Sequence, residues 1–131
     1  MIHINRKIDK KRILLTGGAG YIGSHVAVEL LESGFDIVIA DDFSNSSEES
    51  LMGIRKITGR DFSFYNIDIC DKLSLYDLFE REQIDVVIHL AGYKAVDEAI
   101  KSPLKYYQNN IVATITLLEV MDARSEERRV G

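Results

Sequence analysis

Short apolar runs alternate with longer amphipathic segments along most of the chain. The apolar runs, which are expected strands, fall at about residues 12–16, 37–40, 62–67 and 85–90. Between them, apolar residues recur every three to four positions, which is the period of a helix. Strands that alternate with helices in this way predict an α/β fold, a Rossmann-type doubly wound parallel sheet that is truncated after about four strands.

The expected first helix, from about residue 21 to residue 33, carries one apolar stripe. Ile22, Val26 and Leu30 recur at i, i+4 and i+8, and Gly34 supplies a left-handed stop. The expected strand at 85–90 is nearly all apolar, which is typical of a strand covered on both faces. We also expect the outer edge of that fourth strand to be unpaired.

Helix starts are marked by capping residues. Ser46 and Glu49 have the spacing of a capping box, and Asp71 precedes a helix whose core positions are Leu75, Leu78 and Phe79. Ser102 and Pro103 open a last helix that is apolar nearly all round from residue 111 to residue 121. This helix therefore requires cover on more than one side. Its polar residues Asn109 and Asn110 stand out, and periodicity leaves open which of them faces a ligand.

Three glycines follow the first strand in the segment TGGAGYIGSH. Gly17 allows a sharp turn off the strand, Gly20 allows backbone to approach a diphosphate, and Gly23 allows the next helix to lie close to the sheet. The N–H groups near Gly20, Tyr21 and Ile22 open that helix without intrahelical acceptors. This turn predicts a diphosphate site, and no Gly-Lys-Ser/Thr follows that would indicate a P-loop.

An acidic residue ends the expected second strand. The Asp41 carboxylate can accept both hydroxyls of an adenosine ribose and would repel a 2′-phosphate, so it favours NAD over NADP. Asn45 and Ser46 could hydrogen-bond adenine or ribose, although capping is the alternative for Ser46. Asp68 either accepts the adenine amino group or is only a turn residue. Lys94, after the small residues that end the fourth strand, could meet a phosphate or ribose oxygen.

Composition narrows the class of ligand. The chain has 131 residues, 46% hydrophobic and 28% charged, and a net charge of -5, which argues against nucleic acid or an anionic membrane as a partner. The single cysteine, Cys70, excludes an internal disulfide and fits a cytoplasmic location. The three histidines lack metal-ligand spacing, so no metal site is expected, and His89 is interpreted as a hydrogen-bonded core residue.

Several segments together resemble the N-terminal part of the UDP-glucose 4-epimerase family of extended short-chain dehydrogenases/reductases. They are TGGAGYIGSH, IADDFSNS, IDI, HLAGYKAVDEAI and PLKYYQNNI. The resemblance runs from about residue 12 to residue 122. It implies that NAD is contacted by Tyr21, Ile22, Asp41, Asp42, Phe43, Ser44, Asn45, Ser46, Asp68, Ile69, Leu90, Ala91, Gly92, Tyr93, Lys94 and Asn109. Asp42 departs from the asparagine that is common in the family, which puts that one contact in doubt.

The resemblance also implies a reaction and partners. The full-length protein would invert C4 of UDP-glucose and UDP-galactose by transient hydride transfer to bound NAD, and it would be a homodimer. The family's base is a tyrosine with a lysine four residues on, whose charge lowers the tyrosine pKa. No tyrosine here has that partner, since the residues four on are His25, Ile69, Glu80, Asp97, Asn110 and Ile111. We therefore expect no catalytic residue on this chain.

The extent of the resemblance divides the chain into three parts. Residues 1–11 are an expected N-terminal extension, and residues 12–123 are an expected partial NAD-binding Rossmann domain. The last residues, RSEERRVG, match a translation of sequencing-adapter DNA, so our hypothesis is that 124–131 is an artefactual tail; a natural charged tail is the alternative. Two other functions stay open: another NAD-dependent nucleotide-sugar epimerase or dehydratase, and a non-catalytic NAD-binding module.

Overall fold

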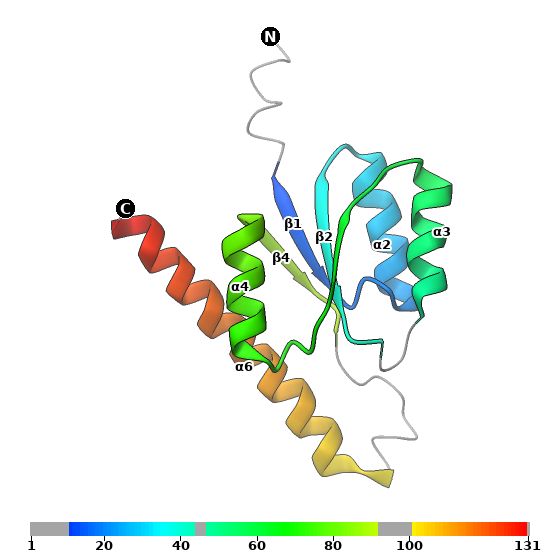
Figure 1. Cartoon of the computed structure of the whole chain (residues 1–131). Coiled ribbons are helices and arrows are strands. Elements are labelled where there is room, and N and C mark those ends of the chain that lie inside the picture. Colours follow the sequence, from blue (N-terminus) through cyan, green and yellow to red (C-terminus); the bar gives the residue numbers. More distant parts are fainter. Residues whose placement is uncertain (1–10, 44–46, 92–100, 131) are drawn as a thin grey trace.

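The computed structural model describes residues 11–43, 47–91 and 101–130, with the side chains of 126–130 left out of the description. Within these residues strands and helices alternate, as the sequence pattern predicts (Figure 1). The elements are β1 (Arg12–Thr16), α2 (Tyr21–Glu32), β2 (Asp36–Asp41), α3 (Glu48–Thr58), β3 (Ser63–Asn66), α4 (Lys72–Glu82), β4 (Val86–His89) and α6 (Pro103–Val130).

The strands form one parallel sheet in the order β3-β2-β1-β4. In the register, Thr16 lies beside Ala40 on one side and beside His89 on the other, so the carboxyl ends of the strands share one edge. The chain builds outward from β1 to β3 and then returns to the other side of β1 for β4. The Rossmann-type topology is thereby confirmed, with the reversal of strand order between β1 and β4.

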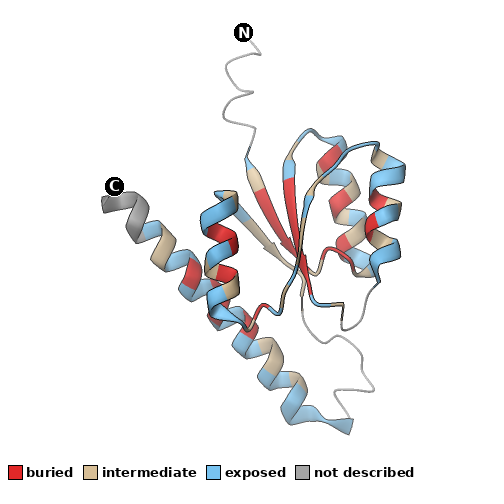
Figure 2. Ribbon diagram, in the orientation of Figure 1, coloured by how far each residue is buried: buried red, intermediate tan, exposed pale blue. Residues whose placement is uncertain are grey.

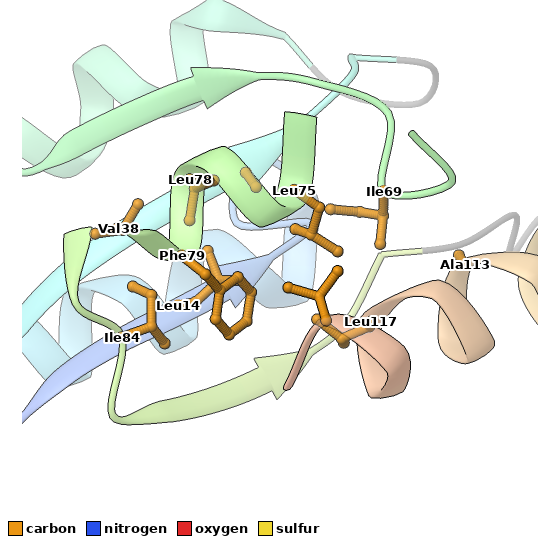
Figure 3. Packing of buried hydrophobic residues seen from close by; sticks show 11 residues of the cluster. Leu14, Val38, Ile69, Leu75, Leu78, Phe79, Ile84, Ala113 and Leu117 are labelled. Carbon is orange, nitrogen blue, oxygen red and sulfur yellow. The ribbon is translucent and has the colours of Figure 1, made fainter. Parts of the chain in front are cut away.

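Helices cover both faces of the sheet, α2 and α3 on one and α4 and α6 on the other (Figure 1). Alternation along β1 divides the core accordingly, because Ile13 and Leu15 pack under α2 and α3 whereas Leu14 faces α4 and α6. Figure 2 shows the buried residues concentrated in β1, β2 and the inner faces of the helices. In Figure 3, Leu75, Leu78 and Phe79 of α4 close over Leu14, as their spacing predicts.

The core face of α2 is one residue away from the predicted stripe. Gly23, Ala27 and Leu31 are buried, whereas Ile22 is 55% exposed. Of the predicted stripe, Val26 and Leu30 are partly buried and pack against the core, whereas the prediction was wrong for Ile22. Small residues at 23 and 27 let the helix axis lie close to the sheet, and this closeness decides which face is buried.

The predicted caps meet with different outcomes. Asp71 caps α4, since its carboxylate accepts the Ser74 N–H at 3.3 Å. The capping box at Ser46 and Glu49 was wrong, because α3 begins one residue later, with Ser47 at the N-cap and no side-chain cap bond. Two glutamates in the first turn instead complement the helix dipole. Gly34 and Gly59 both have left-handed φ values, +91° and +65°, where their helices end.

The fourth strand and the last helix are incompletely covered among the described residues. The residues of β4 are half-buried or exposed, so the prediction of full cover was wrong. The expected unpaired outer edge explains this, because β4 pairs only with β1 in the described sheet. On α6, Ala113, Leu117 and Val120 are buried. Its exposed large apolar side chains are Leu104, Tyr107, Ile111, Val112, Ile115, Leu118 and Met121.

The helix α6 continues through the charged segment to Val130. Ala, Arg and Glu are strong helix formers, so this backbone needs no apolar stripe to remain helical. The hypothesis of an artefactual tail at 124–131 stays a prediction. No helix in the described part of the chain is long and apolar enough to cross a membrane.

A polar cluster ties the amino edge of the sheet to α4. The Glu82 carboxylate accepts the Tyr65 hydroxyl at 2.6 Å through one oxygen and the Arg12 guanidinium at 3.1 Å through the other. Arg12 also donates to the Glu82 carbonyl at 3.2 Å. Burial, and then the bond to Glu82, raise the pKa of Tyr65. This edge lies opposite the carboxyl ends of the strands, so the cluster serves stability.

We expect Tyr65→Phe to lower the free energy of unfolding by about 1 kcal/mol near neutral pH, through loss of one hydrogen bond to a charged acceptor. Because folding raises the pKa of Tyr65, its contribution is present below about pH 10 and is lost as the pH rises through the folded pKa. Urea unfolding at several pH values measures this. Tyr107→Phe, at a site that is 60% exposed, is the control; equal effects of the two changes would contradict the role of Tyr65.

Candidate functional site

The strand order reverses between β1 and β4, and the carboxyl ends of these two strands lie side by side. The chain leaves β1 at Thr16, turns through Gly17 to Gly20 and enters α2 at Tyr21. Asp41, at the end of β2, lies on one side of this turn, and Leu90, just after β4, lies on the other. In doubly wound sheets, ligands bind at this position. The structure therefore brings the two halves of the predicted site together.

The turn glycines lie against other backbone. Gly17 has φ +75°, and a Cβ there would lie 2.8 Å from the Ala91 nitrogen. A Cβ on Gly23 would lie 2.1 Å from the Gly17 carbonyl oxygen. Among the described residues, a Cβ on Gly20 would meet only that same carbonyl oxygen, at 3.3 Å. Gly17 and Gly23 are thus fixed by internal packing, while Gly20 leaves its outer side open.

The N-terminus of α2 suits an anion. Its N-cap is Gly20, with no side-chain cap bond, and its first turn holds no acidic residue. The first N–H groups of a helix have no intrahelical acceptors, and the helix dipole adds positive potential there. Tyr21 and Ile22, 82% and 55% exposed, lie at this first turn. The geometry can hold a phosphate or diphosphate through backbone N–H groups.

Asp41 braces the turn as well as ending β2. One carboxylate oxygen accepts the Ala19 N–H at 3.0 Å, and the other accepts the Phe43 N–H at 2.8 Å. The residue is only 7% exposed. A carboxylate oxygen can accept more than one hydrogen bond, and the predicted ribose contact stays a prediction. The brace itself was missed, because it depends on where the turn folds back over β2.

The residue that follows the acidic pair is strained. Phe43 has a left-handed φ of 60°, which is costly for a bulky residue, and its ring lies 5.2 Å from the Phe64 ring. The bond from its N–H to Asp41 and the ring contact hold this conformation. Asp42 is exposed beside it. Phe43 is thus held at the end of β2, on the edge of the sheet where an adenosine would lie in a site of this kind.

The turn after β3 forms a second wall of the site. The Asp68 carboxylate accepts the Cys70 N–H at 2.9 Å, so it is a turn residue, and the adenine contact stays a prediction. Ile69 is 5% exposed and its side chain lies in the core (Figure 3). Asn109 of α6 faces this turn, with its carbonyl oxygen 3.7 Å from the Cys70 sulfur. Asn109 therefore lies at this wall.

Cys70 is a protected thiol. Burial is the first cause that raises its pKa, to about 11, and the nearby charges of Asp68 and Asp42 add to it. A thiol with such a pKa is a poor nucleophile near neutral pH. Among the described residues no group of three or more His, Cys, Asp or Glu side chains could hold a metal ion.

Two residues that the sequence pattern did not single out shape the site. Thr16 is fully buried, and its hydroxyl accepts the N–H groups of Leu90 and Ala91 at 3.0 and 3.2 Å. A Cβ on Gly18 would lie 2.7 Å from the Ile39 side chain, so Gly18 is needed for the turn to lie over β2. Position alone could have indicated both, since each adjoins Gly17. The predicted contacts Ser44, Asn45, Ser46, Gly92, Tyr93 and Lys94 lie outside the described residues.

A sequence model of the family described as GDP-mannose 4,6 dehydratase matches residues 14–130, which is most of the chain. The chain belongs to this family.

Within this family, the curated proteins that resemble the chain include several UDP-glucose 4-epimerases. UDP-glucose 4-epimerase of Bacillus subtilis is 52% identical over 110 residues, which are 84% of this chain and 32% of that protein. UDP-glucose 4-epimerase of Dictyostelium discoideum is 50% identical over 119 residues, 91% of this chain and 35% of that protein. The chain thus spans about a third of the length of these curated relatives and resembles their sequences closely.

Solved structures agree with the fold. UDP-glucose 4-epimerase from Bifidobacterium longum, crystallised with NAD+ and UDP, superposes with a TM-score of 0.85 at 40% identity and covers 88% of this chain and 34% of that one. The enzyme from Stenotrophomonas maltophila, crystallised with NAD and formylated UDP-arabinopyranose, gives 0.83 at 42% identity, with 86% and 33% covered. The described Rossmann-type fold is therefore the fold of these enzymes over the region that this family member covers.

We expect Gly23→Ala to cost more than about 3 kcal/mol of stability, because its Cβ would overlap the Gly17 carbonyl oxygen and neither backbone can move freely. Gly53→Ala is the matched control. Gly53 lies inside α3 with nothing within 4 Å of an added Cβ, so we expect a gain of about 0.5–1 kcal/mol. Urea unfolding compares the two. A Gly23→Ala protein as stable as the parent would refute the close approach of α2.

We expect the alkylation of Cys70 by iodoacetamide to be slow at pH 8 and to rise steeply toward pH 11, since the thiolate reacts and the pKa is about 11. Asp68→Asn removes a negative charge beside the thiol, which lowers that pKa and should speed the reaction several-fold at pH 8. Glu80→Gln, an exposed change on α4, is the control. The single cysteine makes the mass shift unambiguous. Equal alkylation rates in Asp68→Asn and Glu80→Gln would show that the charge of Asp68 does not raise the pKa of Cys70.

Proposed function

We propose that this chain is the NAD-binding N-terminal part of a UDP-glucose 4-epimerase. The observation that carries the proposal is the open cradle at Gly20, which faces the uncapped start of α2 with Asp41 beside it. A diphosphate and an adjoining ribose need these two features at this spacing. The epimerases named above, about half identical to this chain over most of its length, supply the support for the family of reaction.

The residues present fit NAD. The N–H groups at Tyr21 and Ile22 would meet the diphosphate, and the Asp41 carboxylate would meet the adenosine ribose. Two negative side chains at the end of β2, Asp41 and Asp42, would repel the 2′-phosphate of NADP. The remaining predicted contacts are Phe43, Asp68, Ile69, Leu90, Ala91 and Asn109 in the described part of the chain. The side chain of Ile69 is core, so its contact would come from backbone.

In the proposed full-length enzyme, bound NAD supplies a transient hydride acceptor for C4 of the UDP-sugar. The task of this chain is to bind and orient that cofactor through its backbone and carboxylates. The proposed substrates, UDP-glucose and UDP-galactose, and the proposed homodimer belong to the full-length protein. With no Tyr-x-x-x-Lys in its sequence, the 131-residue chain carries no base for the sugar hydroxyl.

A nucleotide-sugar dehydratase is the second candidate, because the matching family model carries a dehydratase description. Both enzyme classes would use the same cofactor half of the site. The relatives' names favour the epimerase. A full-length gene product assayed with UDP-galactose would separate the candidates, since only the epimerase returns UDP-glucose from it.

We expect the purified chain to bind NAD more tightly than NADP and to show no turnover of UDP-galactose. Asp41→Asn should reduce the preference for NAD by roughly tenfold, because the charge that repels the 2′-phosphate is lost. Asp36→Asn, the same change at the opposite end of β2, is the matched control and should leave the preference unaltered. Isothermal titration calorimetry measures both affinities.

Two results would count against the proposal. Equal affinities of the parent chain for NAD and NADP would contradict the role of Asp41. Turnover of UDP-galactose by the 131-residue chain would contradict the absence of a catalytic base.

A further inference from the structure

A chain of polar groups crosses from the cofactor turn to α6 through His89. This residue ends β4 beside Thr16, and its ring lies between Thr16 of β1 and Thr114 of α6. Its Nδ1 is 2.6 Å from the Thr16 hydroxyl, and its Nε2 is 3.4 Å from the Thr114 hydroxyl. In Figure 1, α6 passes along the sheet on the β4 side, where this contact is made.

The hydrogen bonds of Thr16 fix the state of the imidazole. The Leu90 and Ala91 N–H groups can only donate, so the Thr16 hydroxyl accepts from both, and the Leu90 N–H is shared with the Thr16 carbonyl oxygen at 3.0 Å. Its single hydrogen then goes to His89 Nδ1, the third close partner, at 2.6 Å. Nδ1 must therefore be an acceptor without hydrogen, and a neutral imidazole carries its hydrogen on Nε2.

At the α6 end of this series of polar groups, the directions of the hydrogen bonds are also defined. The Thr114 hydroxyl donates to the Asn110 carbonyl at 3.0 Å, which turns its lone pairs toward the Nε2–H of His89. The hydrogen bonds thus run from the Leu90 and Ala91 N–H groups to Thr16, from Thr16 to His89 and from His89 to Thr114. Hydrogen bonds in such a series strengthen one another by polarisation. Removing the imidazole of His89 would leave Thr16 and Thr114 each without one hydrogen-bond partner.

The position of the Ala91 backbone affects the turn at Gly17. A Cβ on Gly17 would lie 2.8 Å from the Ala91 nitrogen, so the backbone after β4 presses directly on the turn that forms the diphosphate cradle. The Thr16 hydroxyl holds the same nitrogen from below at 3.2 Å. Because Leu90 is also held by the Thr16 main-chain carbonyl at 3.0 Å, the orientation of the hydroxyl bears chiefly on Ala91.

We propose that His89 is a positioning residue for the cofactor turn, which, as a neutral imidazole with Nδ1 unprotonated, orients the Thr16 hydroxyl and thereby fixes the Leu90–Ala91 backbone against Gly17. This role deepens the proposed function, on which its effect on NAD affinity rests. The imidazole contacts neither substrate nor cofactor in this assignment. It acts through Thr16.

Two amide substitutions separate the bonds of His89. In His89→Asn the amide oxygen can take the place of Nδ1, whereas in His89→Gln the amide reaches the place of Nε2. We expect NAD affinity within about threefold of the parent for His89→Asn and a loss of roughly tenfold for His89→Gln and His89→Leu, as for one buried hydrogen bond. Val87→Ala, on the same strand but outside the chain of polar groups, is the control. It should lower the melting temperature and leave the affinity within about twofold.

The tautomer gives a readout that needs no cofactor. Long-range 15N NMR of the parent chain should show His89 with Nδ1 unprotonated, assigned by comparison with His89→Asn. The amide resonance of Ala91 should shift little in His89→Asn and strongly in His89→Gln. A protonated Nδ1, or equal Ala91 shifts and equal NAD affinities in the two amide variants, would overturn the proposal. If the parent chain binds no NAD, the proposed function fails, while the tautomer and the Ala91 shifts still decide the role of His89.

Discussion

Everything at the carboxyl edge depends on the approach of three backbone segments around Gly17. The end of β1, the start of α2 and the residues after β4 meet so closely that a Cβ on Gly17 or Gly23 would overlap main-chain atoms. Backbone cannot repack as a side chain can, so these contacts set the geometry of the whole turn. The openness at Gly20 follows from them, because its neighbours are already held in place.

Asp41 illustrates how one residue can serve the fold and a ligand together. Its two bonds, to Ala19 and Phe43, link the turn, the end of β2 and the strained loop beyond it. A ribose that met the same carboxylate would find it already oriented, so little ordering would remain for the binding step. The role in the fold and the proposed role in recognition are therefore cooperative rather than alternative.

The sequence was sufficient where local chemistry decides the outcome. The parallel α/β sheet, the Gly34 stop and the Asp71 cap depend on a few neighbouring residues, and each was predicted correctly. It failed where tertiary closeness decides. The buried face of α2 is set by the space at Gly23, and the brace of Asp41 and the hydrogen bonds of Thr16 connect residues far apart in sequence. No periodicity records such contacts.

The two edges of the sheet have different roles, and among the described residues neither edge carries the groups that would distinguish one reaction from another. The Glu82 cluster stabilises the amino edge, and the carboxyl edge presents the oxygen and backbone groups that suit a dinucleotide. An epimerase and a dehydratase place the same demands on that half of the site. They differ in the groups that face the sugar, and the tyrosine-lysine pair that would begin that set does not occur in this sequence. The choice of an epimerase over a dehydratase therefore rests on sequence identity to the epimerases. The geometry of the carboxyl edge supports only the choice of cofactor.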